Sequence, residues 1–153
     1  MNPNALHQVA VAGASGRMGH MLIEAVIAAD DCQLAGALDI ASSPAIGQFA
    51  TGFLGHASGP VITADLAAGL SAARVLIDFT RPEGTLEHLK ACRTHGVHAV
   101  IGTTGFTEAQ KADAEAATES GDATSYSSST DDAGGTLASD EALAALRERL
   151  AGR

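Results

Sequence analysis

Short apolar runs alternate along the chain with segments in which apolar residues recur every three or four positions. The runs predict buried strands, and the helical period predicts amphipathic helices. Strands are predicted at residues 9–12, 33–38, 60–63, 74–79 and 97–101, and helices at residues 16–29, 66–72, 82–95 and 107–117. Residues 42–59 keep no sustained period, so we expect a loop there with one helical turn around residues 46–49. Strands joined by helices form βαβ units, and the pattern therefore predicts a doubly wound α/β fold with a parallel sheet.

Several predicted helices have residues that suit their ends. Asp65 and Thr107 carry side-chain oxygens that can accept from the free N–H groups of a first turn. Pro82 suits the first position of a helix, and Gly96 suits the left-handed residue that follows a last turn.

Three glycines spaced three residues apart follow the first predicted strand: Gly13, Gly16 and Gly19. Glycines allow a sharp turn and leave room for a pyrophosphate, whose charge the N-terminus of the next helix attracts. Asp39 follows the second strand, 20 residues beyond Gly19, where an acidic side chain can bind the adenosine ribose. These features predict a dinucleotide site. The alternatives are an ordinary glycine-rich turn and a purely turn-forming role for Asp39.

The composition changes at Thr118 to mostly Ser, Thr, Gly and Asp. Residues 118–138 cannot bury enough apolar surface to offset their ordering entropy, so we expect a linker or long loop. Ser139 suits the start of a C-terminal helix within residues 139–153. Residues 1–117 would then form the dinucleotide-binding domain.

Composition narrows the classes of partner. The chain has 153 residues, of which 46% are hydrophobic and 3% aromatic, and its net charge is −9. A negative charge and few aromatic rings argue against nucleic-acid binding. The two cysteines lack a paired spacing, no apolar run has the length of a membrane span, and the first residues do not resemble a signal peptide. We therefore expect a cytoplasmic protein without a membrane partner.

The remaining reactive side chains predict neither a metal site nor a catalytic nucleophile. His95 and His98 are three residues apart, but they lie on either side of a helix end. We expect His88 to be solvated and Cys92 to pack in the core, while Cys32 lies at a helix-to-strand turn. No Lys-Ser or Lys-Thr pair follows the glycines, which excludes a Walker-type phosphate loop.

Three segments together resemble one enzyme family. They are G-x-x-G-R-M-G at residues 13–19, I-D-F-T-R-P-E-G-T at residues 77–85 and V-I-G-T-T-G-F at residues 100–106. In this order and spacing they resemble the N-terminal half of dihydrodipicolinate reductase, an oxidoreductase of the bacterial diaminopimelate and lysine pathway. The resemblance covers about residues 9–117.

The resemblance implies a Rossmann-like domain that binds NADH or NADPH. The residues that it assigns to the cofactor are Gly13, Ser15, Gly16, Arg17, Met18, Gly19, Asp39, Phe79, Thr80, Gly102 and Thr104. The glycines would shape the pyrophosphate loop, Arg17 and Met18 would contribute backbone N–H groups, and Asp39 would hold the ribose hydroxyls. The four residues from Phe79 onward would line the nicotinamide end, where Thr104 would also reach a substrate carboxylate.

The choice between the two cofactors depends on the residue after Asp39. Members of the family that accept NADPH readily often have an arginine there, and this chain has Ile40. An ionised Asp39 without that arginine repels a 2′-phosphate, so we expect NADH to be preferred. Arg17 could offset part of this repulsion.

The family continues into a second domain that this chain does not match. That domain carries a histidine-rich stretch, a lysine and the sequence D-A-P-S-G-T, none of which occurs in residues 118–153. We therefore expect cofactor binding without turnover by the chain alone and no catalytic residue within it. Most contacts of the family's tetramer would be missing, which leaves a homo-oligomer open. The alternatives are a non-catalytic NAD(H)-binding module and a truncated or engineered scaffold fragment.

Overall fold

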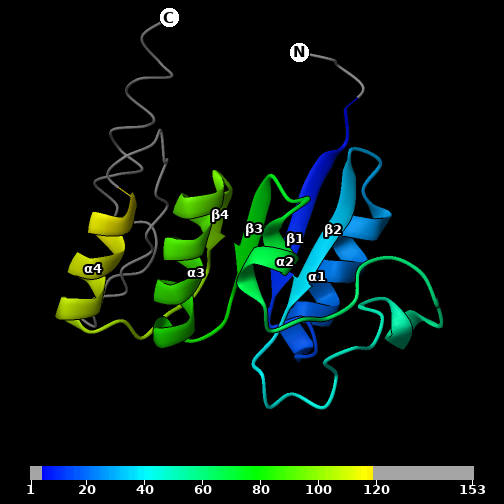
Figure 1. The fold of residues 1–153 in the computed structure, drawn as a ribbon, viewed down its shortest axis with the longest axis horizontal. Helices are drawn as coiled ribbons and strands as arrows, with labels where there is room; N and C mark the ends of the chain where they lie inside the picture. The colour runs from blue at the N-terminus through cyan, green and yellow to red at the C-terminus, as the bar shows by residue number, and fades with distance from the viewer. Residues whose placement is uncertain (1–4, 119–153) are drawn as a thin grey trace, which may run out of the picture.

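The structure, a computed structural model, describes residues 5–118, in which strands and helices alternate (Figure 1). The elements are β1 (His7–Ala12), α1 (Arg17–Ala28), β2 (Cys32–Leu38), the 3₁₀ helix η1 (Gly52–Leu54), α2 (Leu66–Leu70), β3 (Val75–Asp78), α3 (Pro82–His95), β4 (His98–Ile101) and α4 (Glu108–Thr118). This order confirms the doubly wound α/β prediction for the described part of the chain.

The described strands form one parallel sheet in the order β2-β1-β3-β4. The chain leaves β1 toward β2 on one side and returns to add β3 on the other side. The carboxyl ends of β1 and β3 therefore meet at the point where the strand order reverses. In open parallel sheets, ligands bind in the crevice outside this point.

Helices cover both faces of the sheet (Figure 1). On one face, Ile23 of α1 packs in a buried cluster with Val11 and Ala37. On the other face, Leu70 of α2 and Cys92 of α3 belong to a cluster that includes Ala10, Leu38 and Leu76. Strands that are covered on both faces read as continuous apolar runs, which is why the sequence identified them.

The residues predicted at the start of α2, at both ends of α3 and at the start of α4 are confirmed, whereas α2 ends at Leu70 and not at residue 72 as predicted. The Asp65 carboxylate accepts from the backbone N–H of Ala68 at 3.2 Å, and Pro82 is the first residue of α3. Gly96 follows α3 with φ of +66°. The Thr107 hydroxyl accepts from the N–H of Gln110 at 3.2 Å, and the Gln110 side chain accepts from the N–H of Thr107 at 2.9 Å. The last pair is a capping box.

Two local predictions are wrong. The helical turn expected at residues 46–49 occurs instead as η1, where the ring of Phe53 stacks on His20 of α1 with centroids 3.9 Å apart. Residues 60–63 make only isolated bridges, from Val61 to Phe49 and from Thr63 to Leu38. This segment forms hydrogen bonds first to the preceding loop and then to the end of β2. It therefore pairs with neither over enough residues to form a strand.

The linker predicted at residues 118–138 and the helix predicted at residues 139–153 fall almost wholly outside the described residues. Among the described helices, none is both long enough and apolar enough to cross a membrane.

Candidate functional site

The glycine turn connects β1 to α1 at the edge of the sheet where the strand order reverses. Gly13 has φ of +67°, a left-handed conformation that favours glycine, and its carbonyl oxygen accepts from the N–H of Gly16 at 3.0 Å. A Cβ added to Gly19 would lie 2.0 Å from the same carbonyl oxygen. The turn and the first turn of α1 are therefore in direct backbone contact, and side chains at these glycines would separate them.

The N-terminus of α1 presents backbone donors beside this turn. Gly16 is the capping residue and offers no side chain to accept from the first N–H groups. Arg17 and Met18 follow with exposed side chains, and Met18 is 40% exposed. Uncapped N–H groups and the positive end of the helix dipole form an anion-binding position. This geometry suits a pyrophosphate.

Asp39 is held against the glycine turn by Ser15. One carboxylate oxygen accepts from the backbone N–H of Ser15 at 2.9 Å and also from the Ser15 hydroxyl. The other oxygen accepts from the N–H of Ile40 at 2.8 Å. A carboxylate offers about four acceptor positions, so roughly one remains for a ligand hydroxyl. Asp39 therefore connects the glycine turn to the end of β2.

Phe79 and Thr80 follow β3 and lie between the glycine turn and the end of β4. The Phe79 ring, 41% exposed, lies so close to Gly102 that an added Cβ there would be 2.1 Å from it. The methyl group of Thr80 would lie 3.0 Å from a Cβ added to Gly13. These contacts join the two halves of the predicted site. Thr104 is exposed on the turn after β4.

Sequence reasoning missed a buried polar cluster beneath these turns. Asp78, the last residue of β3, is fully buried and accepts from His88 Nδ1 on α3 at 2.6 Å. It also accepts from the N–H and hydroxyl of Thr80 at 2.9 and 2.6 Å. The hydroxyls of Thr85 and Thr103 are 2.7 Å apart in the same cluster. A carboxylate that ends an apolar strand, followed by a histidine on the next helix, is the sequence signal that indicates such a pair.

The environment of Asp78 favours its ionised form. Burial alone would raise the pKa of this carboxyl, but hydrogen bonds from His88 and Thr80 outweigh it and hold the pKa below its usual value. The expectation that His88 is solvated is wrong, because its side chain is only 14% exposed and is paired with Asp78. Cys92 does pack in the core. Burial, with a contribution from the charge of Asp78, raises the pKa of its thiol to about 11.

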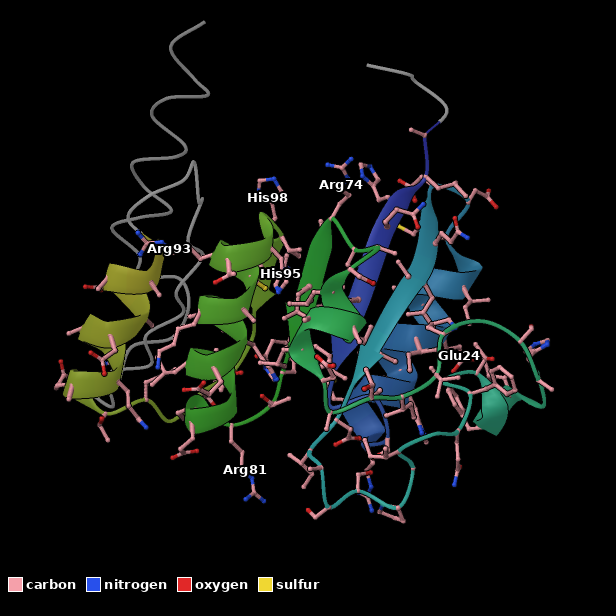
Figure 2. The ribbon with its side chains drawn as sticks, viewed as in Figure 1. Glu24, Arg74, Arg81, Arg93, His95 and His98 are labelled. Atoms are coloured by element: carbon pink, nitrogen blue, oxygen red, sulfur yellow. The ribbon has the colours of Figure 1, made fainter. Side chains whose placement is uncertain are left out.

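Basic side chains lie at both ends of the strands (Figure 2). Arg81 is exposed at the carboxyl ends, where the glycine turn also lies. Arg74 and His98 lie at the amino ends, where β3 and β4 begin. No group of three potential metal-ligating side chains occurs among residues 5–118.

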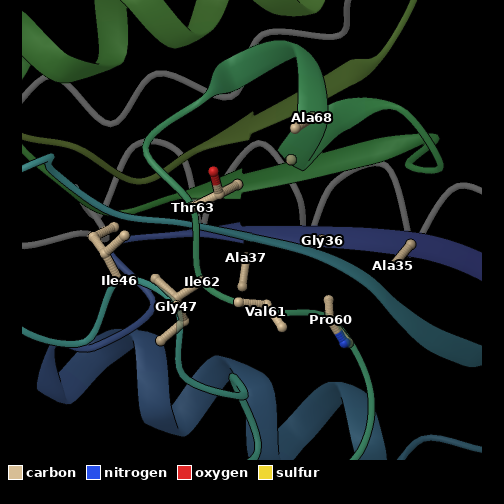
Figure 3. A pocket seen from close by; sticks show the side chains of 11 residues that line it. Ala35, Gly36, Ala37, Ile46, Gly47, Pro60, Val61, Ile62, Thr63 and Ala68 are labelled. Carbon is tan, nitrogen blue, oxygen red and sulfur yellow. The ribbon is translucent and has the colours of Figure 1, made fainter.

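A cavity of about 470 Å³ lies beside β2 (Figure 3). Small residues of β2 (Ala35, Gly36 and Ala37), residues 60–63 and part of α2 line it, together with Ile46 and Gly47. None of the residues assigned to the cofactor lines this cavity. The cavity and the predicted dinucleotide site therefore have no lining residue in common.

The comparisons with known proteins agree on one family. A family model described as "Dihydrodipicolinate reductase, N-terminus" matches residues 7–128. The 4-hydroxy-tetrahydrodipicolinate reductase of Herminiimonas arsenicoxydans is 63% identical over 112 residues, which cover 73% of this chain and 42% of that protein. The corresponding reductase of Cupriavidus taiwanensis is 62% identical over 104 residues, which cover 68% of this chain and 39% of that protein.

A solved structure supports the fold. Dipicolinate-bound dihydrodipicolinate reductase from Paenisporosarcina sp. TG-14 matches 73% of this chain and 43% of that chain, with a TM-score of 0.55 and 24% identity. The chain spans about two fifths of the length of the curated relatives it matches. The match over residues 7–128 and the identity to these relatives lead to one conclusion: the chain belongs to the family of dihydrodipicolinate reductase N-terminal domains.

Proposed function

We propose that the chain is the NAD(P)H-binding domain of a dihydrodipicolinate reductase-like oxidoreductase of the diaminopimelate and lysine pathway. The observation that carries this proposal is the contact between Asp39 and Ser15. This contact holds the carboxylate to which we assign ribose binding against the glycine turn, near the point where the strand order reverses. The family match supports the same assignment.

The geometry suggests where each part of the dinucleotide binds. The pyrophosphate would lie against the first N–H groups of α1, contributed by Arg17 and Met18, with Asp39 on the adenosine ribose. The nicotinamide end would lie near the Phe79 ring. Thr104 is exposed on the next turn, which is compatible with a contact to a substrate carboxylate.

NADH is the preferred cofactor in this proposal. The Asp39 carboxylate stands where the 2′-phosphate of NADPH would approach, and like charges repel. The next residue, Ile40, is 69% exposed and brings no positive charge. The Arg17 side chain is exposed at the start of α1. Its positive charge would attract the 2′-phosphate of NADPH and so limit the preference for NADH.

Turnover by this chain alone is not expected. Hydride transfer requires a positioned acceptor as well as the cofactor. The resemblance assigns the proton donor and substrate-binding groups to a second domain, and residues 118–153 do not match it. We propose that the chain binds cofactor and depends on that domain for reduction.

Titration calorimetry with the full chain tests cofactor binding. NADH should bind more tightly than NADPH at one ionic strength. Asp39→Asn should weaken NADH by about tenfold, because hydrogen bonds to a charged group contribute about 1.5–3 kcal/mol. Glu24→Gln is the matched control, since Glu24 is exposed on α1 (Figure 2). Absence of NADH binding would contradict the cofactor assignment, and equal affinities would contradict the preference.

An activity assay tests the dependence on a second domain. The purified chain with NADH and dihydrodipicolinate should consume no cofactor. Stoichiometric consumption of NADH would show that the chain is itself sufficient.

A further inference from the structure

Asp78 and His88 form a buried pair that the assignment of cofactor residues does not include. The Asp78 carboxylate is fully buried and the His88 side chain is 14% exposed, with 2.6 Å between Oδ2 and Nδ1. A buried carboxylate is costly unless donors surround it. Asp78 has three close donors, namely His88 Nδ1 and the N–H and hydroxyl of Thr80.

The pair joins the two turns that carry the predicted nicotinamide residues. Through Thr80, the Asp78 side chain fixes the turn after β3, and Phe79 lies between these two residues. The Asp78 carbonyl oxygen accepts from the N–H of Gly102 at 2.8 Å, at the start of the turn after β4. The Thr103 hydroxyl lies 3.4 Å from the Asp78 carboxylate. One buried side chain and its backbone therefore bind both turns.

Apolar packing is available on this face of β3, so burial of the position does not by itself require a polar pair. Leu76, two residues earlier on the same face of β3, is fully buried in an apolar cluster that also contains Cys92. Replacing a buried ionic pair with well-packed apolar residues is often neutral or stabilising. Polar groups occur instead at the end of the strand, where the Phe79 ring lies against Gly102. From α3, His88 is hydrogen-bonded to the Asp78 carboxylate, and Thr85 lies in the same polar cluster through Thr103. The charge of Asp78 also contributes to the raised pKa of the Cys92 thiol.

We propose that Asp78 and His88 are positioning residues that hold the Phe79–Thr80 turn and the Gly102–Thr103 turn in the conformation that receives the nicotinamide half of the dinucleotide. This inference rests on the proposed function. In it, His88 donates from Nδ1 to the ionised carboxylate of Asp78. The adenosine half binds elsewhere, at the glycine turn and Asp39, and does not depend on the pair.

The test compares NADH with ADP-ribose, which lacks the nicotinamide half, by titration calorimetry on the full chain. His88→Leu removes the donor to Asp78 and should weaken NADH by about tenfold while changing ADP-ribose less than about twofold. His88→Asn places an amide N–H near the position of Nδ1 and should restore NADH affinity to within about threefold of the unaltered chain. His95→Leu, an exposed position on the same helix, is the control and should change neither affinity.

The outcomes separate this inference from the proposed function. Failure of the unaltered chain to bind either ligand would contradict the proposed function. ADP-ribose binding as tight as NADH binding would leave the nicotinamide half without a site and overturn the inference alone. Three other results would also overturn the inference: unchanged NADH affinity in His88→Leu, an equal loss of affinity for NADH and ADP-ribose in that variant, or no recovery of NADH affinity in His88→Asn. If His88→Leu does not fold, Asp78→Asn keeps the shape of the buried side chain, and unchanged NADH affinity in that variant would overturn the inference.

Discussion

Replacing Gly19 with alanine should disrupt the glycine turn, because the added Cβ clashes with the backbone of the turn. The added Cβ would lie 2.0 Å from the carbonyl oxygen of Gly13, 2.8 Å from its carbonyl carbon and 2.9 Å from Cα of Ala14. All three atoms belong to the backbone, so no side chain can rotate away. The turn and the helix must move apart by about 1 Å, because close-packed interiors leave no room for the extra atom.

The magnitude follows from two opposing effects. Overpacking of this kind costs about 1–3 kcal/mol. Alanine in a helix is favoured over glycine by about 0.8–1.0 kcal/mol, which offsets part of the cost. Because all three close atoms are backbone atoms, the overpacking cost belongs at the upper end of its range, and we expect a net destabilisation of about 2 kcal/mol. We also expect at least a tenfold loss of NADH affinity, because the first N–H groups of α1 no longer converge with the turn.

Urea unfolding followed by circular dichroism measures the first effect, and calorimetry measures the second. Gly52→Ala is the control, because an added Cβ at this exposed position meets nothing within 4 Å. Gly102→Ala places a Cβ equally close to a neighbour, 2.1 Å away, but that neighbour is the partly exposed ring of Phe79. This variant should lose affinity with little loss of stability. Gly19→Ala with stability and NADH affinity equal to those of Gly52→Ala would refute the reasoning.

Three further predictions concern charge and protonation. Ile40→Arg adds a cation beside Asp39 and should raise NADPH affinity relative to NADH by about tenfold in calorimetry; an unchanged ratio would contradict the electrostatic argument. Because the pKa of Asp78 is lowered in the folded state, its stabilising contribution is complete above its ordinary pKa of about 4 and is lost as the pH falls through the lower folded value. The urea concentration at the unfolding midpoint should therefore decrease as the pH is lowered below about 4. It should decrease less steeply in Asp78→Asn. Burial and Asp31 also raise the pKa of the Cys32 thiol, but this side chain is partly exposed, whereas the Cys92 thiol is buried with its pKa raised to about 11. Cys92 should therefore react with iodoacetamide more slowly than Cys32 at about pH 8, as followed by mass spectrometry; equal rates would contradict this prediction.

The secondary structure was predictable where local signals were strong. Apolar runs located β1, β2, β3 and β4, and capping residues located the ends of α3 and the start of α4. The helical turn predicted at residues 46–49 was wrong. The short helix of this loop is η1, where the ring of Phe53 stacks on His20 of α1. Contacts between segments distant in sequence do not appear in a local pattern.

Some residues of the candidate site were likewise predictable from local sequence, and others were not. The glycine turn and Asp39 were predicted from spacing alone, and the structure joins them through Ser15. Their role in binding a dinucleotide stays a prediction. Asp78 and His88 were not identified. They are ten residues apart on different elements, and only the packing of α3 against β3 brings Nδ1 to within 2.6 Å of the carboxylate.

The sequence by itself determined the order of strands and helices, the parallel sheet and the position of the glycine turn, because these follow from side-chain periodicity and from residues with unusual backbone freedom. The tertiary structure alone decided which polar groups meet. It brought Ser15 to Asp39, the Phe79 ring to Gly102 and His88 to Asp78. The physical reason is that burial and hydrogen bonding depend on the distance between elements in space, which a pattern along one chain does not contain.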